Sequence, residues 1–240
     1  MTNKIILEIR AGAGGDEAAI FAGDLVKMYQ KYAARCGWKF TILDFNQTSL
    51  DGYKTFTAEV EGEGVYKILK NEAGVHRVQR IPKTEKSGRI HTSTASVAVI
   101  PEVEEKEVHI NPSDLETSFF RSSGPGGQNV NKVETAVRIL HKPTGIVVSS
   151  QAGRSQHANR ETAMSILRAK LYEQKQIEEQ IKLGSLRHEQ IGGAERAEKI
   201  RTYNFPNDRI TDHRINKKWH NIERILDGEL DQIVNAFTKQ

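Results

Sequence analysis

The sequence predicts an α+β protein built from more than one domain, for three reasons. Its 240 residues exceed the size of a usual single domain, and 37% of them are hydrophobic, which is enough for sizeable cores. Runs typical of strands alternate with stretches of helical spacing. Past residue 113 the sequence changes character, so we expect a domain boundary there.

Residues 1–112 are predicted to form the first domain. They begin with a strand, a glycine turn and a long helix whose apolar residues recur at helical spacing. Gly37 ends this helix, and Cys36 is expected to be buried just before it. The pattern further predicts a short helix ended by Gly74, and strands over 38–45, 53–60 and 89–103, the last of them half-buried.

After the boundary we expect two short strands, a long helix and a returning segment. The strands are predicted over 134–141 and 145–151, and the helix over 155–181 with Ser155 as its cap. Residues 182–199 have the composition of a polar linker. The remainder predicts short strands and an amphipathic helix that packs on the first domain.

Composition and charge narrow the functional classes. The single cysteine excludes a disulfide framework or multi-cysteine metal site and indicates a reducing compartment, and the scattered histidines form no metal-ligand pattern. No run approaches the roughly 18 apolar residues of a membrane helix, and the N-terminus lacks a secretory signal, so we expect a cytoplasmic protein. Residues 121–170 contain eight Lys/Arg and only two acidic residues. This local excess of positive charge would attract a partner with a phosphate backbone.

Two glycine-rich turns are candidates for a site. Residues 12–17 have the setting of a dinucleotide site, but Asp16 and Glu17 would repel a phosphate at the helix N-terminus, so no nucleotide cofactor is expected and helix capping is the simpler interpretation. Residues 124–128, Gly-Pro-Gly-Gly-Gln, have the composition of a plain loop. If this loop is catalytic, Gln128 can act only by hydrogen bonding, through a backbone N–H that stabilises an oxyanion and an amide that orients water.

A third candidate, residues 76–93, interleaves arginines with side chains able to bond base edges. Gln79 and Thr92 are of this kind, and the ring of His91 can also stack on a base. An exposed hairpin would have the same composition. The stretch is therefore compatible with RNA binding and with an ordinary surface hairpin.

At these residues the sequence closely resembles the bacterial and organellar class I peptide chain release factors, specifically the type that reads UAA and UAG. Residues 74–93, 122–146, 154–171 and 198–216 match family signatures in order and spacing, and the resemblance covers essentially the whole chain. It implies stop-codon-dependent hydrolysis of peptidyl-tRNA on the ribosome, an activity usually classed with translation factors rather than enzymes. It needs no metal or other cofactor.

The resemblance also implies a domain plan. Residues 1–112 would form a codon-recognition domain, and residues 113–190 an inserted peptidyl-tRNA hydrolase domain. Residues 191–240 would supply a switch region and a C-terminal segment that packs on the codon-recognition domain.

In the hydrolase domain, Gly126, Gly127 and Gln128 match the family loop that reaches the peptidyl transferase centre. There the backbone amide at the glutamine stabilises the developing charge, while the side chain favours water over bulkier nucleophiles. Gln128 also matches the glutamine that a dedicated methyltransferase converts to N5-methylglutamine. Implied partners are thus the ribosome with its RNA, the mRNA stop codon and peptidyl-tRNA, the methyltransferase, and a GTPase release factor that recycles the complex.

In the codon-recognition domain the resemblance assigns each base a reader. Gly14 and Glu17 match the family residues that recognise the first-position uridine. The tripeptide that begins at Pro82 and ends at Thr84 matches the family tripeptide that reads the second base. His91 matches the ring that separates the second and third bases. Gln79 and Thr92 match the readers of the third base.

Two departures from the family pattern stand out. Lys83, inside the tripeptide, is larger than the alanine or valine often found there, which leaves the second-base selectivity to be tested. The family's N-terminal helical domain is not represented, because residue 1 lies just before the first strand of the codon-recognition domain. We expect either a truncated chain with an added start or a natural short form.

Two other functions compete with this one. A codon-independent ribosome-rescue hydrolase would keep Gly-Gly-Gln but should lack the tripeptide at 82–84 and the readers at 91–92, and should end in a basic tail, which "LDQIVNAFTKQ" is not. A catalytically silent RNA-binding module fits the basic stretch, but gives the intact Gly-Gly-Gln loop no purpose.

Overall fold

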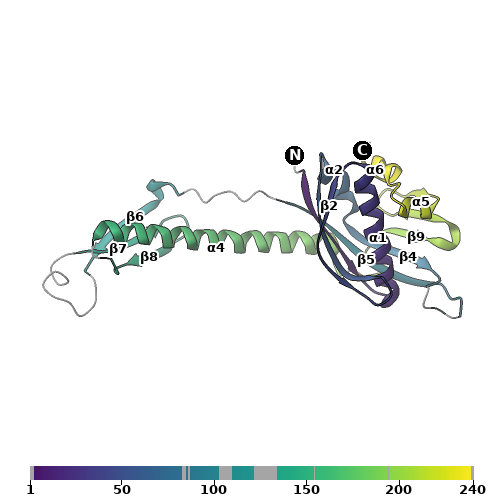
Figure 1. The fold of residues 1–240 in the computed structure, drawn as a ribbon, viewed down its shortest axis with the longest axis horizontal. Helices are drawn as coiled ribbons and strands as arrows, with labels where there is room; N and C mark the ends of the chain where they lie inside the picture. The colour runs from purple at the N-terminus through teal and green to yellow at the C-terminus, as the bar shows by residue number, and fades with distance from the viewer. Residues whose placement is uncertain are drawn as a thin grey trace. The chain divides into compact units, whose positions relative to one another are not determined.

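The computed structural model describes residues 3–82, 85, 87–102, 110–121, 134–153, 155–193 and 195–238. The chain divides into two compact units, of which residues 1–103 with 183–240 form the first and residues 104–182 the second. Both contain helices and strands, which confirms the predicted α+β class (Figure 1). The divisions fall at 103/104 and 182/183, compared with the expected 112/113 and 190/191.

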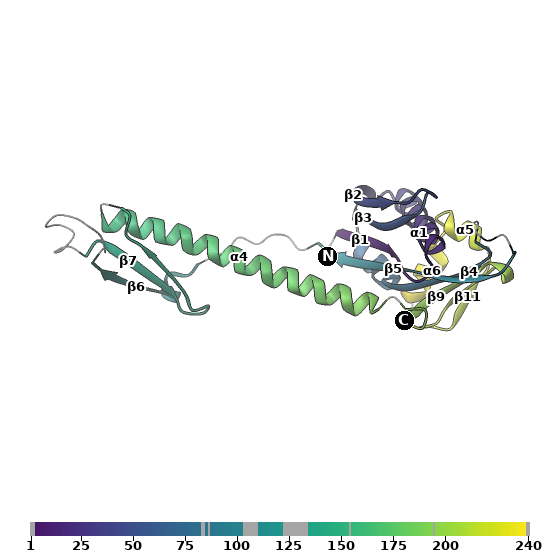
Figure 2. The same cartoon turned by 90° about the horizontal axis from the view of Figure 1, so that it is seen from below.

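The first unit is built on an eight-stranded sheet of order β11-β10-β9-β4-β5-β1-β3-β2 (Figure 2). Neighbours are antiparallel except β4 and β9, which run parallel. The strands are β1 (Lys4–Ala11), β2 (Lys39–Gln47), β3 (Tyr53–Glu61), β4 (Gly74–Arg80), β5 (His91–Pro101), β9 (Lys199–Asn204), β10 (Arg209–Asp212) and β11 (Lys217–Trp219).

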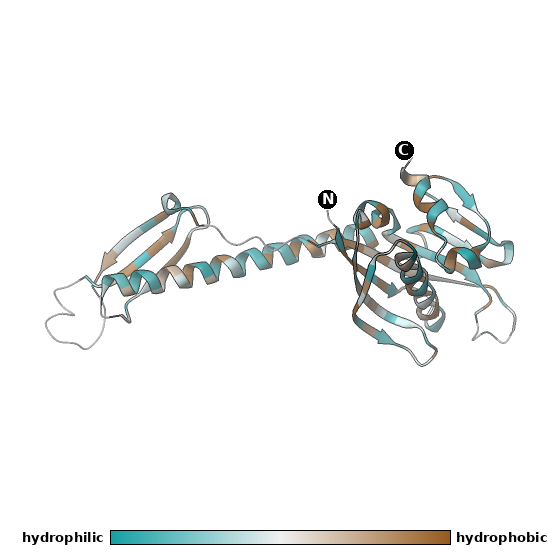
Figure 3. Ribbon diagram, turned by 45° about the horizontal axis from the view of Figure 1, so that its top comes forward, coloured by the Kyte–Doolittle hydropathy of each residue, from teal (hydrophilic) through white to brown (hydrophobic). Residues whose placement is uncertain are grey.

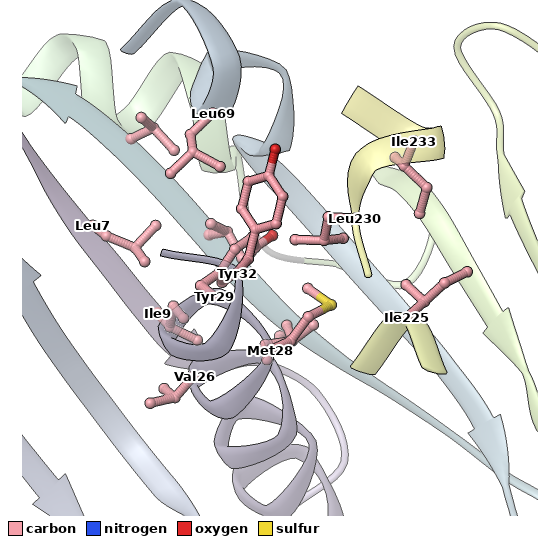
Figure 4. Close-up of a cluster of buried hydrophobic side chains, with 14 of the residues drawn as sticks. Leu7, Ile9, Val26, Met28, Tyr29, Tyr32, Leu69, Ile225, Leu230 and Ile233 are labelled. Carbon is pink, nitrogen blue, oxygen red and sulfur yellow. The ribbon is translucent and has the colours of Figure 1, made fainter. Parts of the chain in front are cut away.

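Helices pack on one face of this sheet and enclose the main core. They are α1 (Asp16–Arg35), α2 (Val65–Leu69), α5 (Ile222–Leu226) and α6 (Asp231–Thr238), with short 3-10 helices η1 (Lys70–Glu72) and η3 (Phe205–Asn207). Figure 4 shows Leu7 and Ile9 of β1 beside residues of α1, and Ile233 of α6 across from them. Because α5 and α6 belong to this core, the C-terminal segment packs on the first unit.

The second unit is a three-stranded antiparallel sheet of order β6-β7-β8, with the first part of a long helix packed on it. Its elements are η2 (Pro112–Asp114), β6 (Leu115–Phe120), β7 (Ala136–His141), β8 (Ile146–Ser150) and α4 (Gln156–Ile191). Ala163, Leu167 and Leu171 of α4 pack on the sheet. Figure 3 shows α4 as mostly hydrophilic, because only this narrow stripe is buried. Ser155 caps the helix by accepting the N–H of Ala158 at 3.2 Å.

The predicted linker over 182–199 is wrong in its first half, because α4 continues to Ile191. Contacts with the first unit's sheet stabilise this extension. Arg187 donates two hydrogen bonds to Glu8, at 2.9 and 2.5 Å. The amide of Gln190 pairs with both the N–H and the C=O of Val99, each at 3.0 Å, and so satisfies β5 beyond its last pair with β4.

Other details of the first unit also differ from expectation. Cys36 is exposed rather than buried, as are Ala34 and Arg35 before it. β5 is buried at every residue from Ser93 to Ile100 rather than on one face only. β4 and β6 were not predicted as strands, since their polar and aromatic residues hide the alternation.

A buried ion-pair network ties β9 to the elements before the inserted unit. Arg201 has no exposed surface and forms a bidentate pair with Glu72, at 2.5 and 2.8 Å. Its Nε donates to Asp212 at 3.2 Å, and Arg214 donates to the same carboxylate at 2.8 Å. Although burial opposes ionisation, the Arg201 charge holds the pKa of Glu72 below its usual range.

Replacing Arg201 by Met should therefore lower the free energy of unfolding by about 3–5 kcal/mol, because the carboxylate of Glu72 would remain buried without its bidentate partner, and Asp212 would keep only Arg214. The measurement is urea unfolding followed by tryptophan fluorescence, since Trp38 and Trp219 both pack in the first unit's core. The matched control is Arg224→Met, which breaks an exposed pair and should cost less than about 1 kcal/mol. Equal losses in the two variants would contradict this account.

His76 is buried against the same network as a neutral ring. One ring nitrogen contacts the carbonyl of Glu72 at 2.9 Å, and the other the hydroxyl of Tyr203 at 3.3 Å. The neutral tautomer satisfies both contacts by donating to the carbonyl and accepting from the hydroxyl. Burial, aided by the Arg201 charge, lowers the pKa of His76 to about 4.

The lowered pKa predicts a loss of stability in acid. Between pH 6.5 and about 4 the unfolded chain binds a proton that folded His76 does not, so the free energy of unfolding falls as the pH falls, by roughly 3 kcal/mol in total. His76→Gln should remove this part of the pH dependence, whereas His220→Gln, at an exposed site of the same unit, should keep it. Urea unfolding at several pH values tests this, and parallel profiles for wild type and His76→Gln would refute it.

Candidate functional site

The N-terminal tip of α1 lies tightly against the start of β5. Gly14 has φ +134°, and a Cβ there would be 2.2 Å from Oγ of Ser93, so only glycine fits. Thr94 holds the turn from the other side, because its Oγ1 accepts the N–H of Ala13 at 2.9 Å. The first turn of α1 thus presents free backbone N–H groups at a fixed place beside β5.

Glu17, in this first turn, is buried and held by one oxygen only. Arg80 at the end of β4 donates from Nε to Oε1 of Glu17 at 2.5 Å and from Nη1 to Asp24 at 2.7 Å. The Arg80 guanidinium also lies 5.2 Å from the ring centre of Phe205. Against the effect of burial, the Asp24 charge and the hydrogen bonds to Glu17 and Asp24 raise the pKa of Arg80. The other Glu17 oxygen, Oε2, is buried and accepts no hydrogen bond from the described residues.

Gln79 and Thr92 form a second group together with Asn204. They face one another across three adjacent strands, because Gln79 pairs with Thr92 of β5 on one side and with Asn204 of β9 on the other. Asn204 donates from Nδ2 to Oε1 of Gln79 at 3.1 Å. Paired residues of a sheet point to the same face, so these three side chains form a row.

The two groups lie on opposite faces of the sheet. Val78 and Tyr203 belong to the helix-covered core, so their sequence neighbours Gln79 and Asn204 point to the other face. Arg80 and its partner His91 return to the helix side, where Glu17 is. The end of the β4–β5 pair therefore supplies polar side chains to both faces.

His91 is oriented by Glu85, which lies in the connection between β4 and β5. Their side chains pair at 2.7 Å, and the His91 side chain is 47% exposed. The N–H of Ser87 donates to Glu85 at 2.6 Å and, with the nearby His91, lowers the pKa of Glu85. Pro82 is buried, and its carbonyl accepts the N–H of Glu85 at 3.0 Å. Lys83 and Thr84 lie outside the described residues.

The structure thus gathers most of the predicted codon readers at one end of the first unit's sheet. They are Gly14, Glu17, Gln79, Pro82, His91 and Thr92. The sequence reasoning missed Arg80, Glu85 and Asn204. Arg80 and Asn204 become visible only once the strand register is known, whereas the nearness of Glu85 to His91 in the sequence could have suggested a pair.

The predicted catalytic residues Gly126, Gly127 and Gln128 lie outside the described residues. The segment that carries them joins β6 to β7, two adjacent antiparallel strands. The start of β7 is held by α4, because Asn159, which is fully buried, donates to the carbonyl of Thr135 at 2.8 Å and accepts the N–H of Gly153 at 2.7 Å. Gln156 donates to the carbonyl of Glu134 at 3.1 Å.

Among the described residues, no group of histidine, cysteine and carboxylate side chains could hold a metal ion. Likewise, no helix in the described ranges is long and apolar enough to cross a membrane.

Comparison with known proteins identifies families that match both parts of the chain. The PCRF domain family matches residues 2–97, and the RF-1 domain family matches residues 103–214. Among solved structures, RF2 of Thermus thermophilus matches with 40% identity and a TM-score of 0.60, over 99% of this chain and 68% of that one. The chain belongs to the peptide chain release factor family.

Relatives named peptide chain release factor 1 are closer in sequence. Those of Carboxydothermus hydrogenoformans and Aquifex aeolicus are each 57% identical to this chain over an alignment that covers 98% of it. The chain spans 65% of the length of these release factors.

The ion pair between Arg80 and Glu17 gives a prediction for the site. Arg80→Met should lower the free energy of unfolding by about 3 kcal/mol, because the buried carboxylate of Glu17 loses its partner. Adding Glu17→Gln should recover at least about 1 kcal/mol of that loss by removing the uncompensated charge. Urea unfolding of the two single variants and the double variant tests this, with Arg10→Met as the exposed control. If the unfolding free-energy changes of the two single variants simply add in the double variant, Arg80 does not stabilise the Glu17 carboxylate.

Proposed function

We propose that the chain acts in translation termination as a release factor of the type that reads UAA and UAG. The observation that carries the proposal is the grouping of Gly14, Glu17, Gln79, His91 and Thr92 at one end of one sheet, although they come from the turn after β1 and from α1, β4 and β5. Codon-independent hydrolysis gives this grouping no role. The first unit is then the codon-recognition domain, and the second the peptidyl-tRNA hydrolase domain.

The chemistry at the α1 tip suits uracil. The base offers an N–H donor between two carbonyl acceptors. The free Oε2 of Glu17 can accept from the N–H, and the backbone N–H groups beside Gly14 can donate to a carbonyl. The same carboxylate disfavours a phosphate at this helix end. Glu17 thus acts as a base reader here rather than as a helix cap alone.

The placement of the readers on two faces suits a codon whose third base is separated from the other two. Gly14 and Glu17 lie on the helix side, and Gln79 and Thr92 on the opposite side. The half-exposed ring of His91 lies at the end of the pair between them, where it can stack on a base. Thr84 is proposed to read the second base through its hydroxyl.

Hydrolysis is assigned to Gly126, Gly127 and Gln128 in the second unit. The backbone N–H at Gln128 would stabilise the oxyanion of the ester transition state, and the amide would orient the attacking water. The ribosome supplies peptidyl-tRNA and the rest of the centre, so the chain needs no metal or cofactor of its own. We further propose N5-methylation of Gln128 by a glutamine methyltransferase, recycling by a GTPase release factor, and a cytoplasmic location.

The test is release of labelled formyl-methionine from ribosomes that carry initiator tRNA and UAA, UAG, UGA or a sense codon. We expect release on UAA and UAG only. Gly127→Ala should abolish release on both while the variant still competes for stop-codon ribosomes, because that change touches hydrolysis and not decoding. Release on every codon would replace the proposal by ribosome rescue. Absence of release with wild type on all four would refute the proposal for this chain.

A further inference from the structure

The strands β4, β9, β10 and β11 are neighbours at one edge of the first unit's sheet (Figure 2). Val78 and Tyr203 belong to the helix-covered core, so their neighbours Arg77 and Thr202 point to the opposite face. The register places further side chains beside them on that face, because paired residues of a sheet point the same way. From β4 to β11 the resulting row consists of Arg77, Thr202, Thr211 and Lys218.

This face of the four strands is positively charged. The strands, all of whose residues the structure describes, contain one acidic residue, Asp212, and it is buried on the core side with Arg201 and Arg214. Arg209 pairs with Asn204 and so adds a further cation to the open face. Its Nε is buried and has no hydrogen-bond partner among the described residues. The face therefore has a local positive potential that attracts anions.

Arg77, in this row, is half-buried and held by one hydrogen bond. Its Nε donates to Oγ1 of Thr202 at 3.2 Å, and that hydroxyl lies 2.8 Å from Nε2 of His213. Burial and the nearby Lys199 and Arg77 charges lower the pKa of His213 against the effect of Asp212, so the ring is neutral and can accept from the hydroxyl. The two Nη groups of Arg77 form no hydrogen bond or ion pair with the described residues.

Arg77 differs in this respect from the buried arginines that stabilise the fold. Arg201 is paired with Glu72, and Arg80 with Glu17, so each charge has a carboxylate beside it. Arg77 has none in the part of the chain that the structure describes, and burial alone lowers its pKa. A half-buried charge without a counter-charge is unfavourable in the free protein. An anion that arrives with a partner would complete the site.

We propose that Arg77 binds a phosphate of the mRNA, the one that follows the third base of the stop codon. The inference rests on the proposed function and adds to it a contact outside the codon. Arg77 lies two residues before Gln79 on β4, roughly 7 Å along the strand and on the same face. An mRNA whose third base lies at Gln79 continues with this phosphate. The two Nη groups can donate to two of its oxygens, while Thr202 holds Nε.

Three mRNAs that differ only after a UAA codon isolate this phosphate. The first ends at the third base with a 3′-hydroxyl, the second ends there with a 3′-phosphate, and the third continues for several nucleotides. The measurement is the affinity of the labelled chain for ribosomes that carry each mRNA and initiator tRNA. Arg77→Gln should weaken binding about tenfold with the second and third mRNAs and leave it unchanged with the first.

Two further variants serve as controls for charge. Arg77→Lys keeps the positive charge but not the fork, and it should lose less affinity than Arg77→Gln with the second and third mRNAs. Arg224→Gln removes the same charge from an exposed site on α5, and it should bind like wild type in all three cases.

Salt dependence and stability separate a phosphate contact from a structural role. With the third mRNA, the slope of log Kd against log salt concentration should fall in magnitude by about 0.7 in Arg77→Gln, because one contact to a single strand is lost. The urea midpoint of Arg77→Gln should not fall, because no carboxylate is left without its partner.

The outcomes that overturn the inference are distinct. An equal loss of affinity with all three mRNAs would place the bound phosphate outside the mRNA or make Arg77 structural, and no loss with any of them would remove the site. Wild type that binds these ribosomes but releases no formyl-methionine would overturn the proposed function instead, and the affinities would still decide the role of Arg77. Wild type that does not bind would overturn both.

Discussion

The parallel pairing of β4 with β9, held by the buried ion pair of Arg201 with Glu72, is the constraint on which the rest of the first unit depends. β9 enters the sheet only after the whole second unit has been inserted, so no local contact can set its register. Past the irregularity between Val75 and His76, the pairing places Arg201 opposite His76, beside Glu72, and Asn204 opposite Gln79. A slip of one residue would turn Asn204 into the core and expose Tyr203. The buried charges add a penalty to any such slip, because each would lose its partner.

The same register explains how one strand pair serves two faces. Side chains alternate along a strand, so the adjacent residues Gln79 and Arg80 point to opposite sides of the sheet. Arg80 fixes Glu17 on the helix side, while Gln79 joins Thr92 and Asn204 on the other. A run of consecutive polar residues at the end of a strand is unfavourable for a buried core, and this is the reason β4 resembles a loop in the sequence. In the fold, that run is the surface that carries the proposed readers.

Sequence reasoning predicted the elements whose signal is local. The apolar spacing of α1, the capping by Ser155 and the strands β1, β3, β7 and β8 depend on neighbouring residues, and the structure confirms them. It failed where contacts with residues distant in the sequence determine the local structure. The end of α4 is helical because Arg187 and Gln190 bind Glu8 and Val99, which no polar stretch can reveal. The predicted readers came from the family resemblance, but their supports, Arg80 and Asn204, act on partners 63 and 125 residues away.

For the proposed codon reading these supports matter, because they restrict the side chains before a codon binds. A free glutamine amide can turn to present either a donor or an acceptor, and would therefore match most base edges at some rotamer. Fixing it costs side-chain entropy during folding rather than during binding. The Asn204 side chain is already fixed by a hydrogen bond that the fold requires, since the N–H of Asn207 needs an acceptor where β9 turns into the 3-10 helix. The arrangement of the Gln79 side chain is in this sense a consequence of how β9 ends.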